Sequence, residues 1–73
     1  MMKTIEVSAK AIQNEIGRRH NNKLRKAKGE PLAKAKAWYL PQLTEPEFKV
    51  ILSGDGVTRE FNSGNTYEFV LKG

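Results

Sequence analysis

Large apolar and aromatic side chains are concentrated in the C-terminal half of the chain. Residues 37–73 contain fourteen of them, whereas residues 10–36 contain only Ile12, Ile16, Leu24 and Leu32. Buried apolar surface contributes about 25 cal/mol per Å², so four scattered aliphatic side chains cannot offset the entropy lost when residues 10–36 become ordered. We therefore expect the C-terminal half to build the core. Residues 10–36 should dock on that core, remain partly mobile, or be ordered by a partner.

The chain begins with a strand pattern followed by a helix pattern. Lys3–Val7 alternates apolar and polar residues, which predicts a short half-buried strand within residues 1–8. Ser8 suits the N-cap of a following helix, because its hydroxyl can accept hydrogen bonds from the free amides of the first turn. Asn21 and Asn22 disfavour a helix interior, so the first helix is expected to end near His20.

The middle of the chain predicts one more short helix. Gly29 is placed like a helix C-cap, and Pro31 sits where proline is tolerated, at the first position of a new helix. Residues 32–40 would form this helix, which Pro41 would end. Residues 9–40 are accordingly expected to be basic and largely helical or partly mobile.

The C-terminal half has a β pattern. Three stretches favour strands and two intervening stretches favour turns: strands at 48–52, 57–61 and 66–71, and turns at 54–56 and 62–65. This order predicts a three-stranded antiparallel meander over residues 47–72. Since a lone meander is marginally stable, Lys3–Val7 should join it as an edge strand and the helical segment should cover its apolar face. The expected fold is a small α+β single domain over residues 1–73.

Residue types limit the chemistry that the chain can perform. The sequence has 73 residues, no cysteine and one histidine, His20. It therefore offers no disulfide framework, no thiolate metal site and few ways to assemble a nucleophile, a base and an orienting group. We expect no enzymatic activity, no cofactor and no metal. No apolar run approaches the roughly 20 residues of a membrane span, so we expect a cytoplasmic, monomeric protein that does not enter the membrane.

Net positive charge is concentrated in the middle of the chain. Residues 10–36 hold nine Lys and Arg against two acids, whereas residues 37–73 hold three against five. The predicted basic patch consists of Arg18, Arg19, Lys23, Arg25, Lys26, Lys28, Lys34 and Lys36. Such a patch suits the phosphate backbone of RNA or DNA, an acidic protein surface, or simple solvation. The chain could thus be an autonomous basic nucleic-acid-binding protein.

Two further features are candidate interaction surfaces. Trp38 and Tyr39 directly follow the basic patch and are either core residues or a platform on which unpaired bases stack. The strand Lys3–Val7 either pairs only within its own sheet or offers a free edge to the sheet of a partner.

Several features of the whole sequence also resemble those of a known group of proteins. It rests on the length, the N-terminal stretch M-M-K-T-I-E-V, the segment R-R-H-N-N-K-L-R-K-A-K and the ending F-V-L-K-G. In these features the chain resembles the small phage-encoded inhibitors and antiterminators that bind bacterial RNA polymerase. The resemblance implies a non-enzymatic transcription regulator in the host bacterial cytoplasm. Such a protein binds the N-terminal region of the largest (β′) subunit near the RNA exit channel. Through this contact it inhibits initiation and promotes antitermination. It also implies that the partner-binding residues are Lys3, Ile5, Glu6 and Val7.

Overall fold

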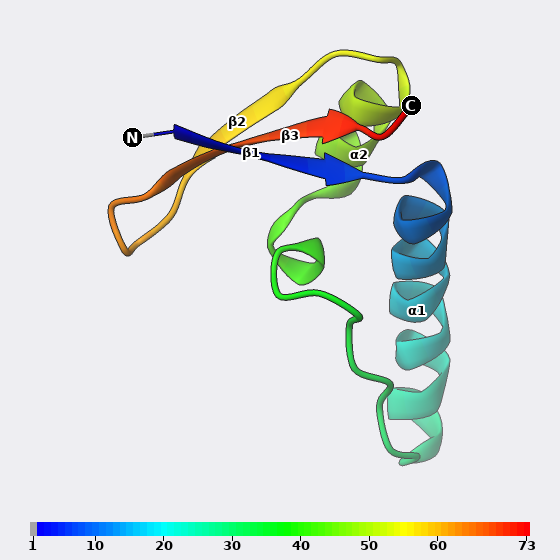
Figure 1. The fold of residues 1–73 in the computed structure, drawn as a ribbon. Helices are drawn as coiled ribbons and strands as arrows, with labels where there is room; N and C mark the ends of the chain where they lie inside the picture. The colour runs from blue at the N-terminus through cyan, green and yellow to red at the C-terminus, as the bar shows by residue number, and fades with distance from the viewer. Residues whose placement is uncertain (1) are drawn as a thin grey trace.

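The computed structural model describes residues 2–73, and Met1, with which the expected N-terminal strand region begins, lies outside them. The chain forms three strands, two α-helices and one short 3₁₀ helix. In chain order these are β1 (Met2–Val7), α1 (Ala9–Lys28), η1 (Leu40–Gln42), α2 (Glu45–Leu52), β2 (Val57–Glu60) and β3 (Thr66–Leu71). Figure 1 shows α1 descending from the end of β1, away from the sheet, while α2 packs close to it. The predicted α+β class is confirmed.

The sheet has the strand order β1-β3-β2, with β3 in the centre. β1 runs parallel to β3, and β2 runs antiparallel to β3. The predicted N-terminal strand is confirmed, and it lies at an edge of the sheet. Parallel strands require a crossover connection. Here the connection from β1 to β3 passes through α1, η1, α2 and β2.

The predicted three-stranded meander is wrong, because residues 48–52 belong to a helix. Thr44 caps α2, its hydroxyl accepts the Glu47 amide, and the Glu47 carboxylate accepts the Thr44 amide in return. This capping box starts a helix in which Phe48 and Ile51, three residues apart, are buried together. Residues 54–56 therefore connect α2 to β2 and are not a hairpin turn. The turn at 62–65 joins β2 to β3 as predicted.

The middle of the chain also differs from expectation. α1 continues past His20 to Lys28, and no helix forms over residues 32–40 apart from the start of η1. Both differences have one cause, because the Asn22 side chain accepts the Ala33 amide and donates to the Ala33 carbonyl. These bonds stabilise α1 beyond His20, and they use the Ala33 carbonyl, which a helix through residue 33 would need as an acceptor. Pro31 consequently starts no helix.

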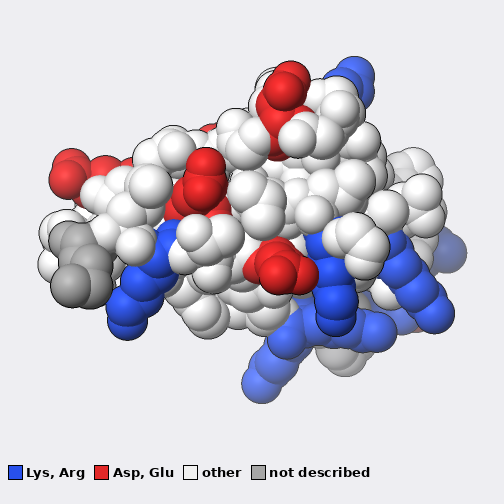
Figure 2. Space-filling view, turned by 45° about the horizontal axis from the view of Figure 1, so that its top comes forward, with Lys and Arg blue, Asp and Glu red and all other residues white. Residues whose placement is uncertain are grey.

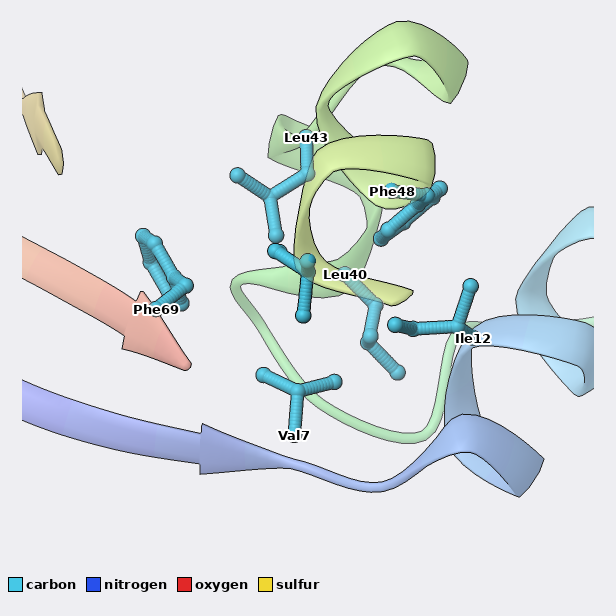
Figure 3. Packing of buried hydrophobic residues seen from close by; sticks show 7 residues of the cluster. Val7, Ile12, Leu40, Leu43, Phe48 and Phe69 are labelled. Carbon is cyan, nitrogen blue, oxygen red and sulfur yellow. The ribbon is translucent and has the colours of Figure 1, made fainter. Parts of the chain in front are cut away.

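The core lies where the strands, α1, η1 and α2 converge (Figure 3). β1, β3 and the three helices, with the residue that follows η1, supply the buried apolar side chains, and the set is Val7, Ile12, Leu40, Leu43, Phe48, Ile51 and Phe69. The C-terminal half supplies five of the seven, as the apolar pattern predicted. Ile12 is the α1 residue that docks the basic segment on this core.

The two glycines of the α1 region should respond oppositely to substitution. Gly29 has a φ of 72°, and its amide and that of Glu30 close the helix end on the Lys26 and Arg25 carbonyls. We expect Gly29→Ala to lower the free energy of unfolding by about 1 kcal/mol, since Ala disfavours this conformation. Gly17→Ala should raise it by about 0.5–1 kcal/mol, because position 17 is helical and its added Cβ meets no atom within 4 Å.

Urea unfolding of both variants measures the difference. A destabilising Gly17→Ala would show that α1 does not continue through residue 17 as described.

Candidate functional site

The second half of α1 and the segment that returns from it form a projecting arm (Figure 1). We define the basic arm as residues 20–37. It contains one acidic residue, Glu30, and six exposed cationic residues: Lys23, Arg25, Lys26, Lys28, Lys34 and Lys36. None of these six forms an ion pair with the other residues that the structure describes. The basic arm therefore presents six charges to solvent or to a partner.

The basic arm is held together by groups other than its lysines. The Asn22 amide group makes two hydrogen bonds with the Ala33 backbone, at 2.9 and 3.0 Å. The Arg25 guanidinium donates to the Pro31 carbonyl at 3.3 Å. These bonds fix the returning segment beside α1, so the lysine ammonium groups remain free.

Arg18 and Arg19, which were also predicted to belong to the basic patch, stabilise the fold and do not face solvent as free cations. Arg18 and Arg19 both bind the carboxylate of Glu15, at 2.6 and 3.0 Å, and the Glu15 side chain is 1% exposed. The hydrogen bond from Arg18 is the main reason that the pKa of Glu15 lies below its ordinary value, although burial opposes this shift. Arg18 and Arg19 thus neutralise a buried acid and do not extend the free basic surface.

Arg19 also positions the turn that follows the basic arm. Its guanidinium donates to the carbonyls of Leu40 and Leu43 and lies 5.0 Å from the ring centre of Phe48. This one side chain links α1 to η1 and to α2. The links fix the place where the returning segment meets the sheet.

Aromatic rings gather at that meeting point. Trp38 lies 5.3–5.8 Å, between ring centres, from Tyr39, Phe61 and Tyr67. Tyr39 is half-buried and its ring lies 5.6 Å from that of Phe69, whereas Trp38 remains 53% exposed. Tyr39 is therefore part of the packed core region, and Trp38 is a surface residue supported by the core.

A groove separates α1 from the returning segment. Its volume is about 420 Å³, and its lining combines apolar side chains such as Leu40 with amide and cationic side chains, which include Asn14, Arg18, Asn21, Arg25, Lys34 and Lys36. The Glu15 carboxylate also lines it but is already paired with Arg18 and Arg19. Arg25, Lys34 and Lys36 give the groove three cations that form no ion pair with other described residues.

The four predicted partner-binding residues of β1 do not form one surface. Val7 is 1% exposed and belongs to the core, and Ile5 is half-buried against it. Lys3 and Glu6 are exposed and lie on opposite faces of the strand, because side chains alternate along it. The Lys72 amide donates to the Val7 carbonyl, which directs the backbone groups of Val7 toward β3 and leaves those of Glu6 at the free edge.

The acidic residues of the sheet lie away from the basic arm. Glu6, Glu60 and Glu68 share the sheet face opposite Phe69, according to the strand register. On the face in view in Figure 2, most Lys and Arg side chains gather at the lower right, and most acidic side chains lie outside that cluster. The molecule has a basic end and an acidic sheet face.

We compared the chain with protein-family models, curated proteins and solved structures. None of the three comparisons found a match. Within residues 2–73, no three His, Cys, Asp or Glu side chains come together in a way that could hold a metal ion. No α-helix of that range is both long enough and apolar enough to cross a membrane.

The sequence analysis missed two residues that shape this site. Asn22 has a weak intrinsic preference for helix, yet its side chain fastens the returning segment to α1. Glu15 was counted only as a charge, although its spacing of three and four residues from Arg18 and Arg19 is the spacing of helix ion pairs. The sequence therefore indicates the ion pairs of Glu15. It does not indicate the contact between Asn22 and Ala33, because these residues are eleven positions apart and follow no known spacing.

Proposed function

We propose that this protein is a non-enzymatic transcription regulator that binds bacterial RNA polymerase, on the largest subunit near the RNA exit channel. The proposal joins the sequence resemblance to one structural observation, the six unpaired cations of the basic arm. Through this contact the protein would inhibit initiation and promote antitermination, as the resemblance implies.

The arrangement of the basic arm supports a role in protein binding. Six like charges on a projecting element repel one another, and a small domain gains no folding energy from them. The arm is nevertheless fastened by Asn22 and Arg25, so it holds its charges in a fixed pattern before any partner arrives. A preorganised basic surface suits an acidic protein surface, where complementary charge raises the association rate and selects the partner.

The edge strand offers a second contact. β1 has one free edge, and the exposed Lys3 and Glu6 flank it. A partner strand could pair with this edge through backbone hydrogen bonds. Of the four residues that the resemblance assigns to the contact, Lys3 and Glu6 are the two that a partner can reach freely.

Charge reversal on the basic arm tests the proposal. A variant with Lys23→Glu, Lys26→Glu and Lys28→Glu should bind core RNA polymerase at least about tenfold more weakly than the unmodified chain, which is about 1.4 kcal/mol. Biolayer interferometry on immobilised polymerase, at low salt, measures this difference. The second variant, with Lys3→Ala and Glu6→Ala, tests the contact on β1.

The chain provides a matched control. Lys10, Lys49 and Lys72 are exposed and lie outside the basic arm, so replacing all three by Glu changes the net charge equally. This control should retain most of the affinity. Equal loss in the arm variant and the control would assign the effect to net charge alone, and no binding by the unmodified chain would contradict the proposal.

A second candidate function is phosphate-backbone binding by the same basic arm. The observation that favours it is the groove between α1 and the returning segment, which Arg25, Lys34 and Lys36 line. In this case the purified protein should bind RNA or DNA with an affinity that falls steeply with salt, and the arm variant should lose this binding. Absence of any complex at about 50 mM salt would exclude this second function.

A further inference from the structure

Trp38 occupies an unusual position for a large aromatic side chain. It lies where the basic arm joins the sheet, and 53% of it is exposed although it contacts three other aromatic rings. An exposed tryptophan held firmly by its neighbours can receive a planar ligand at little cost in side-chain entropy.

The surrounding rings support Trp38 without covering it. The planes of Tyr39, Phe61 and Tyr67 meet the indole plane at 87°, 68° and 67°. All three contacts are edge-to-face, so none of these rings stacks flat on the indole. The rings therefore restrict its orientation, while 53% of the residue remains exposed to a ligand.

Lysines lie close to this aromatic position along the chain and in the sheet. Lys34 and Lys36 precede Trp38 in the returning segment, and at most about 14 Å of backbone separates Lys34 from it. From the sheet, the strand register places Lys3 directly beside Tyr67, on the face that carries the ring cluster. Arg59, on the other side of Tyr67, is already bound to the Gln42 carbonyl and the Glu47 carboxylate. Lysines therefore provide the free charge around Trp38.

We infer that Trp38 is a stacking site for an unpaired base of a single-stranded polynucleotide, whose adjacent phosphates are bound by Lys34 and Lys36. The inference rests on the second candidate function and names its ligand. Aromatic side chains beside a basic groove are the usual means of binding single strands, since every base has a face that can stack and every linkage carries a charge.

A polynucleotide accounts for both features at once. An acidic peptide would use the lysines but would have no need of a supported indole. A duplex would use the lysines as well, but its bases are already stacked on one another. The combination of exposed Trp38 with the exposed Lys34 and Lys36 therefore selects a single strand.

The experiment uses the fact that Trp38 is the only tryptophan of the chain. Its fluorescence, excited selectively over that of the tyrosines, should be strongly quenched when short oligo(U) or oligo(dT) is titrated into the full-length protein at about 50 mM salt. Quenching by both oligonucleotides supports a contact that does not depend on the type of sugar. Quenching by oligo(U) alone supports a contact that includes the ribose 2′-hydroxyl. Absence of quenching by either would overturn the inference.

Variants separate stacking from charge. With a labelled oligonucleotide, Trp38→Leu should weaken binding about tenfold without changing its salt dependence. Lys34→Ala with Lys36→Ala should reduce the slope of log affinity against log salt by about 1.4, at about 0.7 per phosphate. The matched controls are Leu32→Ala, an exposed apolar residue of the same segment, and Lys49→Ala with Lys72→Ala, and both should leave affinity unchanged.

Two further titrations distinguish the ligand classes. The first titration uses duplex DNA. If duplex DNA binds but neither it nor the oligonucleotides quench Trp38, the stacking site is overturned, whereas phosphate binding by the basic arm is retained. Poly-glutamate that quenches Trp38 as strongly as oligo(U) would overturn the inference as well, and would assign the surface to an acidic protein. Circular dichroism of each variant confirms that losses of binding do not reflect unfolding.

Discussion

Replacing Glu15 by glutamine is expected to destabilise the fold by about 3 kcal/mol. The carboxylate is buried and accepts hydrogen bonds from Arg18 and Arg19, whose side chains are only 20% and 26% exposed. Removing the negative charge leaves two partly buried guanidinium groups without their counter-ion. A chain of this length has a free energy of unfolding of about 4–11 kcal/mol, so the loss is a large part of the total. Urea denaturation measures it.

The same carboxylate should make stability depend on pH. In the folded protein the pKa of Glu15 lies below its ordinary value of 4.5, chiefly because Arg18 donates a hydrogen bond to the charged form. The unfolded chain therefore binds more protons in the acidic range, and stability contributed by Glu15 is complete above about pH 4.5. It should decline as the pH falls toward and through the lower pKa of the folded state. Urea midpoints measured across this range should fall less steeply in the Glu15→Gln variant.

Glu30→Gln is the control for both measurements. Glu30 is exposed and forms no ion pair with the other described residues, so its replacement should change stability by less than about 0.5 kcal/mol. Equal stability of Glu15→Gln and Glu30→Gln would contradict the described ion-pair geometry.

The second large effect concerns residues 48–52. We expect Phe48→Ala to cost about 3–5 kcal/mol and Ile51→Ala about 2–5 kcal/mol, because both side chains are fully buried and their removal leaves cavities. Val50→Ala should cost less than about 0.5 kcal/mol, since Val50 is 41% exposed. Thermal or urea unfolding of the three variants measures the pattern.

This pattern distinguishes a helix from a strand. In α2, positions 48 and 51 share the buried face, whereas in a strand positions 48, 50 and 52 would share one face. Large losses at 48 and 50 with little at 51 would contradict α2 and restore the predicted meander. The short helix is stabilised locally by the Thr44–Glu47 capping box and by Pro46 in its first turn. Both signals are present in the sequence, but the run of β-favouring residues outweighed them in our prediction.

The sequence predicted which residue types the candidate site contains but not how their side chains are arranged. The sequence located eight cationic residues and the neighbouring Trp38, and six of the eight remain exposed together with Trp38. It could not show that Arg18 and Arg19 turn inward to Glu15, because a charge count does not reveal which charges neutralise each other. It could not show that Lys3 lies beside Tyr67 either, since that neighbourhood results from parallel pairing of strands more than sixty residues apart.

The sequence by itself determined the local features of this protein. Alternation in β1, the Ser8 cap, the Gly29 cap and the turn at 62–65 all depend on side chains and backbone preferences within a few residues. Only the tertiary structure decided the extent of α1, the helical state of α2 and the path of residues 30–37. In each of these segments local preference is weak or mixed, so distant partners determined the outcome: Ala33 for α1, and the core for Phe48 and Ile51. Hydrogen bonds from Asn22 and Arg25 then hold the returning segment of the basic arm beside α1.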